Sequence, residues 1–478
     1  MAAPCTQSRR ASALAVALWA ALALCAACGP DDSAPQDHGA IATGIAAPLG
    51  EPGPWATAEQ LATFERGKIV ATRRFALADG LGPAFNVTFC TSCHEKPTIG
   101  GGSGLYRNFF LTGRRFPDGA FVPGTSAGKS GGVIRMYNYG PGEPARPAVP
   151  ETTNVVAQRN AIPFFGVGLI AELAGEEIQR RADAKDRDGD GISGRPNWDR
   201  GFVGRFGRKA QTTSIEAFIR GPLFNHLGVT TDPLSQKQRA ALPVDSSDGS
   251  VAWRRHLAPL RAVAQAAAPD GPLNDDDGVA DPEMSTDDLF DLVTFAMLLA
   301  APDVAAETPL TRPGRLLFDQ LGCKTCHTPR LKGPRGLLPV YSDLLLHDMG
   351  ASLADGLEQG EATGSEFRTQ PLWGLAPVGP FLHDGRAETV RMAIELHDGE
   401  GAKARDQANT LSEAQWTELL TFLDSLGGHA QRSPGLLPPS ATLPASGAWG
   451  GPLPGLNALD LNKFRQGRVA FDQEFGRH

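Results

Sequence analysis

Two copies of the pattern C-x-x-C-H constrain this chain more than any other feature of its sequence. They are FCTSCHEKP and GCKTCHTPR, and each supplies two thiols and a histidine: Cys90, Cys93 and His94 in the first, and Cys323, Cys326 and His327 in the second. Disulfides or structural zinc sites would also use such cysteines, but zinc takes four ligands, which Cys-Cys-His at this spacing does not wrap comfortably. A histidine directly after both pairs is the signature of c-type haem attachment, with thioether bonds from the thiols and the histidine as proximal iron ligand. The sequence therefore predicts two covalently bound c-type haems.

The first 28 residues have the composition of an export signal. Two arginines precede an apolar run, Ala11 to Leu24, which is too short to span a bilayer as a stable helix. The string LCAAC, which ends at Cys28, resembles a bacterial lipoprotein box. We therefore expect residues 1–28 to be a lipoprotein signal peptide and residues 29–50 a flexible linker, with the protein held in the periplasm by a lipid on Cys28. Cleavage nearby, which would leave a free soluble protein, is the alternative.

Charge and length limit the class of function and the size of the fold. The formal net charge is -8 and there is no basic stretch suited to nucleic acid, so we expect no nucleic-acid partner. No later apolar run is long enough to span a membrane, so we expect membrane contact only through the lipid anchor. The 478 residues allow two or three domains.

Two similar amphipathic segments follow the two haem motifs. STDDLFDLVTFAMLL begins at Ser285 and SEAQWTELLTFLDSL begins at Ser412, and each opens with a serine that has an acid or amide three residues later. Apolar residues then recur at helical spacing, so each segment predicts the closing helix of one cytochrome c unit. We therefore expect an all-α fold of two cytochrome c-type haem domains, residues 51–303 and 304–430. The first domain is longer and should carry a long, loop-rich insertion.

The expected insertion contains a run of acids, DRDGDGISG. Asp186, Asp188 and Asp190 alternate with other residues and Gly191 follows, which is the front half of a calcium loop. Asn197 stands where an EF-hand needs its bidentate glutamate, so an ordinary EF-hand is excluded. A looser calcium site and a solvated acidic turn both stay open.

The C-terminal tail, residues 431–478, repeats part of the N-terminal region. FERGKIVATRRF begins at Phe64 and FRQGRVAFDQEF begins at Phe464, with phenylalanine, glycine, a basic residue and a final phenylalanine in the same register. In the first copy this segment leads to a haem motif. Our hypothesis is that the tail is the start of a third, truncated unit, and an unmatched amphipathic tail is the alternative.

Several strings of this sequence resemble a known family. They are GLGPAFN, RNAIPFFGVGLIAEL, DGDGISGRPN, GRFGRKA, YSDLLLHDMG and LWGLAPVGPFLHDGRA, and they look like the bacterial di-haem oxidoreductases of the peroxidase or "thiol-oxidoreductase-like" type. The resemblance covers about Glu51 to Leu426. That family is in turn similar to the di-haem cytochrome c peroxidases and to MauG. The resemblance implies two all-α cytochrome c domains, with electrons entering at the C-terminal haem and peroxide reacting at the N-terminal haem.

The resemblance also suggests the second ligand of the C-terminal haem. In the related peroxidases this ligand lies eight residues after the threonine that caps a helix, and counting from Thr389 gives His397. A haem held by His327 and His397 would be low-spin and suited to relaying an electron. His347 and Met349 in LLLHDMG are the competing candidates, although a place in the haem crevice or beside a propionate fits them better.

The N-terminal haem departs from the related peroxidases, which place a distal histidine in the loop after the motif. The loop after His94 reads EKPTIGGGSGLYRNFF and contains neither His nor Met, which implies an open iron as in the MauG-like members. His226 is the nearest later candidate for a cap. Relatives use a glutamate near this site as the acid and base for peroxide cleavage, which points to Glu172 and Glu176, with Glu177 in the same region. For any one of these acids a solvated helix position is the alternative.

Other residues are candidates for electron transfer and haem binding. Family members often carry Trp after G-R-F-G, where this chain has Arg208, so Trp198 and Trp253 are the remaining candidates for an aromatic relay between the haems. Core packing is the alternative for both. Three arginines are candidates for bidentate pairing with haem propionates, with surface ion pairs as the alternative: Arg195, Arg205 and Arg386.

Together these features predict an exported di-haem c-type oxidoreductase of the peroxidase kind, in which the C-terminal haem relays electrons to an open N-terminal haem. Its expected partners are a periplasmic electron donor, such as a small cytochrome or a cupredoxin, and peroxide or another small substrate. A non-enzymatic di-haem electron carrier is one alternative. A MauG-like oxidase of an organic or protein substrate is another. Thiol exchange finds no support, because no cysteine of the mature chain would be left free.

Overall fold

The computed structural model describes the greater part of the chain after residue 38. The described ranges are 39–126, 129–130, 132–140, 146, 148–244, 273–275, 277–428, 445–447 and 451–471. The expected signal peptide, Trp253 and much of the tail lie outside them. Among the helices within these ranges, none is long and apolar enough to cross a membrane.

The expectation of an all-α fold is wrong. The part of the chain that the structure describes is 32% helical and 14% strand, and its strands form several small antiparallel sheets. The largest sheet has the order β3-β2-β7, in which Phe109 pairs with Arg159 at one end of the β2–β7 ladder and Gly113 with Val155 at the other. The segments FFLTGRR and VVAQR are rich in aromatic and β-branched residues, which favour strands once a partner is available. That partner lies about forty residues away, so local periodicity does not reveal it.

The remaining strands are short and pair as hairpins or across loops, in the order β1-β6, β4-β5, β8-β9, β10-β11 and β12-β13. The bounds of all strands are β1 Ala84–Phe85, β2 Phe109–Arg115, β3 Phe121–Pro123, β4 Thr125–Ser126, β5 Lys129–Ser130, β6 Tyr137–Asn138, β7 Val155–Arg159, β8 Trp198–Asp199, β9 Phe202–Val203, β10 Leu331–Gly333, β11 Gly336–Leu338, β12 Leu346–Asp348 and β13 Glu366–Arg368.

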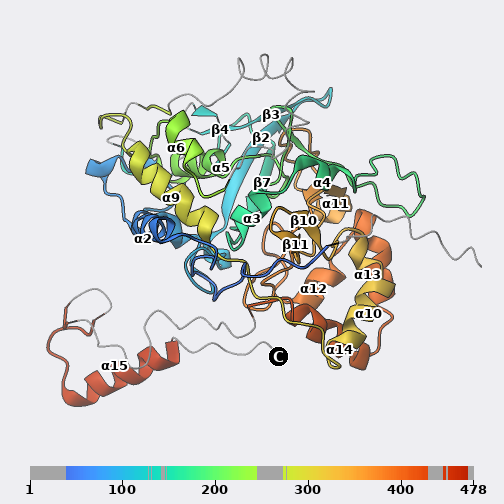
Figure 1. Cartoon of the computed structure of the whole chain (residues 1–478). Helices are drawn as coiled ribbons and strands as arrows, with labels where there is room; N and C mark the ends of the chain where they lie inside the picture. Colours follow the sequence, from blue (N-terminus) through green and yellow to red (C-terminus); the bar gives the residue numbers. More distant parts are fainter. Residues whose placement is uncertain are drawn as a thin grey trace, which may run out of the picture. The chain divides into compact units, whose positions relative to one another are not determined.

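The first of the two expected closing helices is α9, Thr286–Leu298, and it packs against α2, Ala58–Thr72. The Ser285 side chain caps α9 by accepting the N–H of Asp288, as the sequence predicts. The two helices approach closely at Gly67, where an added Cβ would lie 2.0 Å from a backbone carbonyl oxygen of α9. Only glycine fits this contact, so the position fixes how α2 crosses α9 (Figure 1).

The second closing helix repeats this arrangement. Helix α14, Glu413–Asp424, carries the full capping box at Ser412 and packs against α10, Arg312–Gln320. An added Cβ on Gly314 of α10 would lie 2.0 Å from the carbonyl oxygen of Glu418. In both pairs that oxygen belongs to the sixth residue after the capping serine. The same crossing at the same register is what a duplicated unit would produce.

The other helices are short and lie mostly between these pairs. Their bounds are α3 Val167–Ala171, α4 Gly175–Gln179, α5 Ile215–Pro222, α6 Gln236–Ala240, α11 Gly350–Leu353, α12 Val390–Glu395, α13 Ala402–Ala408 and α15 Ala458–Phe471. Single turns are η1 Leu77–Asp79, η2 Cys90–Ser92, η3 Leu105–Arg107, η5 Cys323–Thr325 and η6 Gly399–Gly401, and η4 Leu223–Leu227 is a π-helical turn. Helix α15 includes residues 464–471 of the predicted repeat in the tail, the rest of which lies outside the described residues, and the origin of the tail as a third unit stays a hypothesis.

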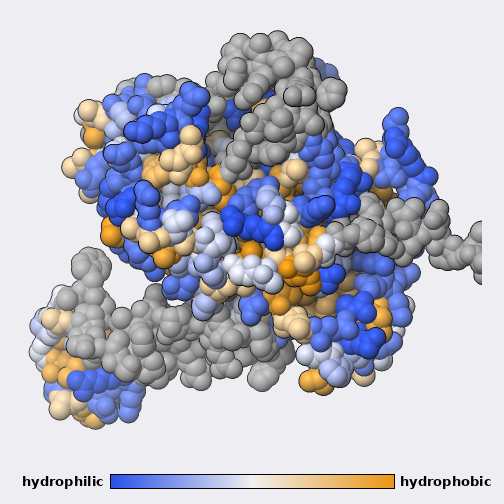
Figure 2. Space-filling model, in the orientation of Figure 1, coloured by the Kyte–Doolittle hydropathy of each residue, from blue (hydrophilic) through white to orange (hydrophobic). Residues whose placement is uncertain are grey.

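Two main groups of buried residues form the core. The larger surrounds α2, α3, α5 and α9 and extends to Leu338 and Trp373, and the smaller surrounds α10 and α14. Residues 41–53, part of which was expected to be linker, run beside both halves: Ala42 donates to Leu337 and Ala47 to Ala301 through backbone hydrogen bonds. The face shown in Figure 2 is mostly hydrophilic, with hydrophobic residues in small groups near its centre.

Candidate functional site: two haem crevices

Each C-x-x-C-H motif begins with a single 3-10 turn, η2 in the first copy and η5 in the second. The turn is closed by backbone hydrogen bonds such as Cys93 N–H to Cys90 O, 3.3 Å, which hold the two thiols near each other and the histidine just beyond. All four cysteines of the described chain are free rather than paired as disulfides. Burial raises the pKa of Cys90 and Cys323 to about 12. Two unpaired thiols with a histidine directly after them are what covalent haem attachment requires.

The two motif histidines share one orientation. The Nδ1–H of His94 donates to the carbonyl of Gly101 at 2.9 Å, and the Nδ1–H of His327 donates to the carbonyl of Tyr341 at 3.1 Å. Burial lowers the pKa of both histidines to about 4, so both rings are neutral near pH 7. With the hydrogen on Nδ1, the lone pair of Nε2 is free to bind a metal. Both residues therefore fit the role of proximal haem ligand.

His397 lies opposite His327. It follows α12, whose N-cap Thr389 accepts the N–H of Met392, and its own Nδ1–H donates to Ala393 O at 2.7 Å. The ring centroids of His327 and His397 are 6.5 Å apart. An iron between them needs two Fe–N bonds of about 2 Å, and each ring centre lies roughly 1 Å beyond its nitrogen, which gives roughly 6 Å. The spacing therefore fits a haem iron bound by both histidines, and this ligand pair stays a prediction.

The competing candidate His347 is held in a different way. Its Nε2 faces a carboxylate oxygen of Asp343 at 2.9 Å, and its Nδ1 faces one of Glu400 at 2.6 Å. Burial alone would lower the pKa of His347, but the charge and hydrogen bond of Asp343 raise it well above its ordinary value. A ring that donates from both nitrogens has no lone pair for a metal. His347 is thus a buried cation beside Cys326, and Met349 lines the same cavity.

The second motif opens into a cavity of about 330 Å³, a volume typical of small-molecule sites. His327 and His397 lie in its wall with mostly apolar neighbours, which include Phe318, Leu372 and Leu423. The wall continues to Phe164, whose ring lies tilted beside that of His94 at a centroid distance of 4.3 Å. The cavity therefore reaches from the second motif toward the first. Within the described residues, Glu400 is the one carboxylate in this wall.

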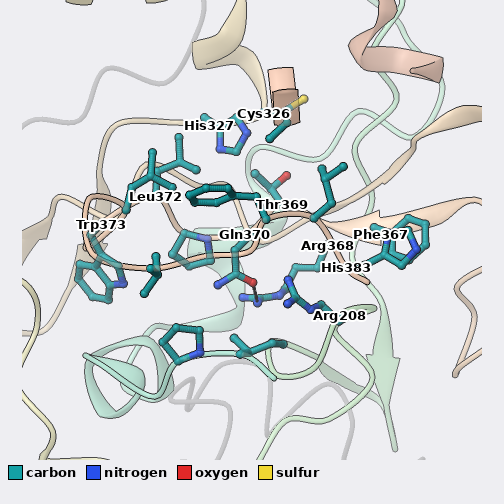
Figure 3. A pocket seen from close by; sticks show the side chains of 18 of the residues that line it. Arg208, Cys326, His327, Phe367, Arg368, Thr369, Gln370, Leu372, Trp373 and His383 are labelled. Atoms are coloured by element: carbon teal, nitrogen blue, oxygen red, sulfur yellow. Dashed lines mark hydrogen bonds between the residues drawn. The ribbon is translucent and has the colours of Figure 1, made fainter. Parts of the chain in front are cut away.

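Two arginines give this cavity a positive wall. Figure 3 shows Arg208 and Arg368 together beside Gln370, whose side-chain oxygen accepts from Arg368 at 2.8 Å. The buried Nε of Arg208 has no partner in the described chain. Burial lowers the pKa of Arg208 to about 9, with a further effect from the charge of Arg368, and burial lowers the pKa of Arg368 to about 10. Buried cations of this kind are stable only beside an anion, and the propionates of a haem would supply it.

The arginines predicted from the sequence are engaged elsewhere. Arg195 forms a bidentate pair with Glu366, and Arg386 pairs with Asp384. Arg205 is fully buried and donates to backbone carbonyls at the end of α3. None of the three lies in the cavity wall. The departure from the family at Arg208 was the available signal, because it places a cation where relatives carry an apolar ring.

The predicted catalytic carboxylates sit in ion pairs outside this wall. Glu172 forms a bidentate pair with Arg335, with distances of 2.7 and 2.9 Å. Glu177 is buried on α4 and bonds to Arg180 and Arg181, and although burial would raise its pKa, these hydrogen bonds lower it. Glu176 is half-buried in the first turn of the same helix. A catalytic role for Glu172 and Glu176 stays a prediction.

The acidic run keeps its three carboxylates close together. Oxygens of Asp186, Asp188 and Asp190 lie within 4.8 Å of one another, and burial raises the pKa of Asp190, with the charges of the other two adding to the effect. The described chain has a second such group, in which Asp281 and Glu283 are joined by Asp275. The string NDDDGVADPE was its sequence signal. Calcium binding at the first group stays a prediction.

Trp373 is an aromatic residue that sequence reasoning missed. It is buried in the cavity wall, and an added Cβ on Gly166 would lie 2.6 Å from its ring. Gly166 has φ +70°, a conformation that glycine adopts without strain, so the chain after Phe164 turns closely over the indole. Trp198, the earlier candidate, lies in β8. Trp373 stands in the string LWGLAP, but the sequence does not indicate that its side chain is buried.

The comparisons with known proteins agree with this site. Residues 147–426 match the family described as "Di-haem oxidoreductase, putative peroxidase". The match covers more than half of the chain, so the chain belongs to this family of di-haem oxidoreductases. No curated protein matches it.

Several solved structures share a distant likeness. The diheme peroxidase BthA from Burkholderia thailandensis E264 is 14% identical, with a TM-score of 0.32 over 82% of this chain and 90% of that chain. Hydrazine synthase from Kuenenia stuttgartiensis is 15% identical, with a TM-score of 0.28 over 82% of this chain and 99% of that one. A MauG-like protein associated with microbial copper homeostasis is 19% identical, with a TM-score of 0.23 over 30% of this chain, and the match spans 56% of that protein.

Proposed function

We propose that this chain is an exported peroxidase-type oxidoreductase with two covalently attached c-type haems, one closed and one open. The observation that carries the proposal is the difference between the two motif histidines. His327 faces a second histidine, with 6.5 Å between the ring centroids, whereas the loop that follows His94 contains neither His nor Met. A haem with two strong ligands suits electron transfer, and a haem with an open position suits reaction with peroxide.

When bound, the haems supply the redox chemistry, and the chain supplies ligation, charge and access. His94 and His327 present Nε2 to the iron because backbone carbonyls hold their Nδ1–H groups. Arg208 and Arg368 would hold haem carboxylates in the cavity. The two cysteine pairs, Cys90 with Cys93 and Cys323 with Cys326, would hold the haems through thioether bonds.

Two aromatic residues support an electron path between the haem sites. Trp373 lies in the cavity wall with His327, and its indole touches Gly166. The ring of Phe164, two residues before that glycine, lies beside that of His94. We assign Trp373 and Phe164 as the contact between the two sites, in place of Trp198.

The proposed setting is the periplasm, with a lipid on Cys28 as the membrane anchor. A small cytochrome or a cupredoxin would deliver electrons to the haem of His327, and peroxide would react at the haem of His94. The balanced reaction takes two electrons and two protons to convert hydrogen peroxide to two waters. Oxidation of an organic substrate at the same open site would use the same residues with a different reductant.

Turnover with a reduced small cytochrome tests this proposal. Two donor molecules should be oxidised for each peroxide consumed, and the His397→Gly variant should slow donor oxidation at least tenfold. His383→Gln is the control, because the ring of His383 stacks on Phe367 at 4.2 Å rather than facing His327. Donor oxidation that stops after the two electrons needed to reduce both haems, with or without peroxide, would instead identify a simple electron carrier.

A further inference from the structure

The histidines assigned to iron share one hydrogen-bond pattern. In His94, His327 and His397 the Nδ1 atom faces a backbone carbonyl, at 2.9, 3.1 and 2.7 Å respectively. A carbonyl can only accept, so the hydrogen is on Nδ1 and the lone pair on Nε2. This pattern identifies a neutral histidine prepared to bind a metal.

His226 has the opposite pattern. Its Nδ1 faces the side-chain nitrogen of Asn86 at 3.0 Å. The amide of Asn86 cannot be turned round, because its oxygen accepts the backbone N–H of Met136 at 2.8 Å. The amide nitrogen therefore donates and His226 Nδ1 accepts, which puts the hydrogen of the neutral ring on Nε2. Burial lowers the pKa of His226 to about 4, with further effects from the charges of Arg135 and His94, so the ring is neutral near pH 7.

The surrounding chain holds His226 against both flanks of the first haem motif. Its backbone oxygen accepts the N–H of Asn86 at 2.7 Å, four residues before Cys90. Its ring meets Phe109 edge-on at 4.6 Å, at the start of the strand that follows the loop of His94. These contacts place His226 beside both segments that flank the haem motif of His94.

The turn that carries His226 is rigid. Arg135 donates to the carbonyls of Phe224 and Asn225 at 2.8 and 3.3 Å, which caps η4 from outside. Gly228 ends the turn with φ +87°, and an added Cβ there would lie 2.5 Å from the carbonyl oxygen of Gly82. The ring is therefore fixed in place by groups on both sides rather than free to reorient.

We propose that His226 does not bind the iron of the first haem but donates a hydrogen bond from Nε2–H to whatever occupies the open position of that iron. This inference rests on the proposed function, because it requires that position to be open. The occupants it favours are hydrogen-bond acceptors such as peroxide and small anions. His226 would then hold the position that sequence reasoning gave to Glu172, and Asn86 would be the positioning residue that fixes its tautomer.

Fluoride binding to the ferric protein tests the donor, because bound fluoride is a strong hydrogen-bond acceptor with a distinct optical spectrum. His226→Leu should weaken fluoride binding at the first haem about tenfold or more, since a hydrogen bond to a charged acceptor is lost. His226→Gln, which keeps a side-chain donor, should restore most of the affinity. The high-spin signal of the first haem should persist in both variants.

Asn86→Asp tests the tautomer itself. A carboxylate at residue 86 accepts the hydrogen of His226 Nδ1 and leaves a lone pair on Nε2, so the first haem should gain low-spin character. Asn138→Asp is the matched control, because the side-chain oxygen of Asn138 accepts the backbone N–H of Gly140 at 2.8 Å rather than orienting an amide toward a histidine.

Three outcomes contradict the inference in different ways. If His226→Leu changes fluoride affinity by less than twofold, His226 is not a hydrogen-bond donor to the iron ligand. The proposal that the first haem is open would still stand. A first haem that is low-spin in the wild type and becomes high-spin in His226→Leu would make His226 a ligand. A first haem that stays low-spin in both would contradict the proposed function as well, since the position would be closed by another group.

Discussion

The two haem sites of this chain are built from the same parts and differ in what faces the iron. At the second site His397 lies opposite His327, and the buried cation His347 lies beside Cys326 between two carboxylates. At the first site the ring of Phe164 lies beside that of His94, and His226 is hydrogen-bonded to Asn86, just before the motif, with its tautomer reversed. Burial lowers the pKa of His94, His226 and His327 to the same value of about 4. The pKa therefore does not distinguish the proposed iron ligands, His94 and His327, from the proposed hydrogen-bond donor, His226. The group that bonds to Nδ1 does distinguish them.

Removing one cysteine pair should have the largest effect on this comparison. Cys323→Ser with Cys326→Ser should leave one covalent haem per chain and remove the low-spin signal. The same change at Cys90 and Cys93 should also leave one haem but remove the high-spin signal. Mass spectrometry counts the haems, and a chain that keeps both after either change would contradict covalent attachment at that motif.

The buried charges at the second site should be the next most sensitive feature. Glu400→Gln should destabilise the folded protein by about 3 kcal/mol, because it leaves the imidazolium of His347 with one carboxylate instead of two. The folded pKa of His347 is raised above 6.5, so its contribution to stability is fully present below pH 6.5 and is lost as the pH rises through that folded value.

Urea unfolding at several pH values measures this effect, with Glu395→Gln on the surface of α12 as the control. The loss in Glu400→Gln should be largest where Glu400 is ionised and His347 is protonated. It should shrink as the pH rises through the raised pKa of His347, and also as the pH falls through the pKa of Glu400. Above the pKa of Glu400, a loss that grew with rising pH would mean that His347 is neutral in the folded protein.

Replacing the glycine at either close helix crossing should lower the stability of the protein by a similar amount. Gly67→Ala and Gly314→Ala each push a methyl group against a carbonyl oxygen, so each should destabilise its half by about 1–3 kcal/mol. Gly467 in α15 has open space around it, so Gly467→Ala should instead leave stability unchanged or raise it by up to about 1 kcal/mol. Thermal unfolding of the three variants compares them, and unequal losses at Gly67 and Gly314 would weaken the case for a duplicated unit.

The smallest effect is expected from replacing Arg208, one of the two buried arginines in the wall of the cavity. Arg208→Met removes a positive charge near the haem carboxylates, which should lower the reduction potential of the low-spin haem by on the order of tens of millivolts. Arg386→Met, which breaks an ion pair with Asp384 instead, should shift it less. Spectroelectrochemical titration separates the two, and an equal shift in both variants would place the propionates elsewhere.

Sequence reasoning reached the parts of this fold that are written in local patterns. Both closing helices begin at the predicted serines, because a capping side chain and helical apolar spacing lie within one short window. The small sheets escaped it, since the ladder between β2 and β7 joins residues about forty positions apart. The sequence therefore predicted an all-α fold, because its helices have local patterns and its strands depend on distant partners.

The site divides in the same way. The haem motifs and the register from Thr389 to His397 are linear features, and the geometry fits them. The roles of Arg208 and Arg368 depend on which charges end up buried without a carboxylate, which no local pattern records. The tautomer of His226 depends on the Asn86 amide and a backbone N–H fifty residues further along, so only the folded chain reveals it.

Low-temperature EPR of the ferric protein, before and after addition of peroxide, tests the central claim most directly. One low-spin signal and one high-spin signal of equal weight are expected, with the high-spin signal lost on peroxide and the low-spin signal lost in His397→Gly. Two low-spin signals that do not respond to peroxide, even after half-reduction, would show that both irons are closed and that the chain carries electrons without reacting with peroxide.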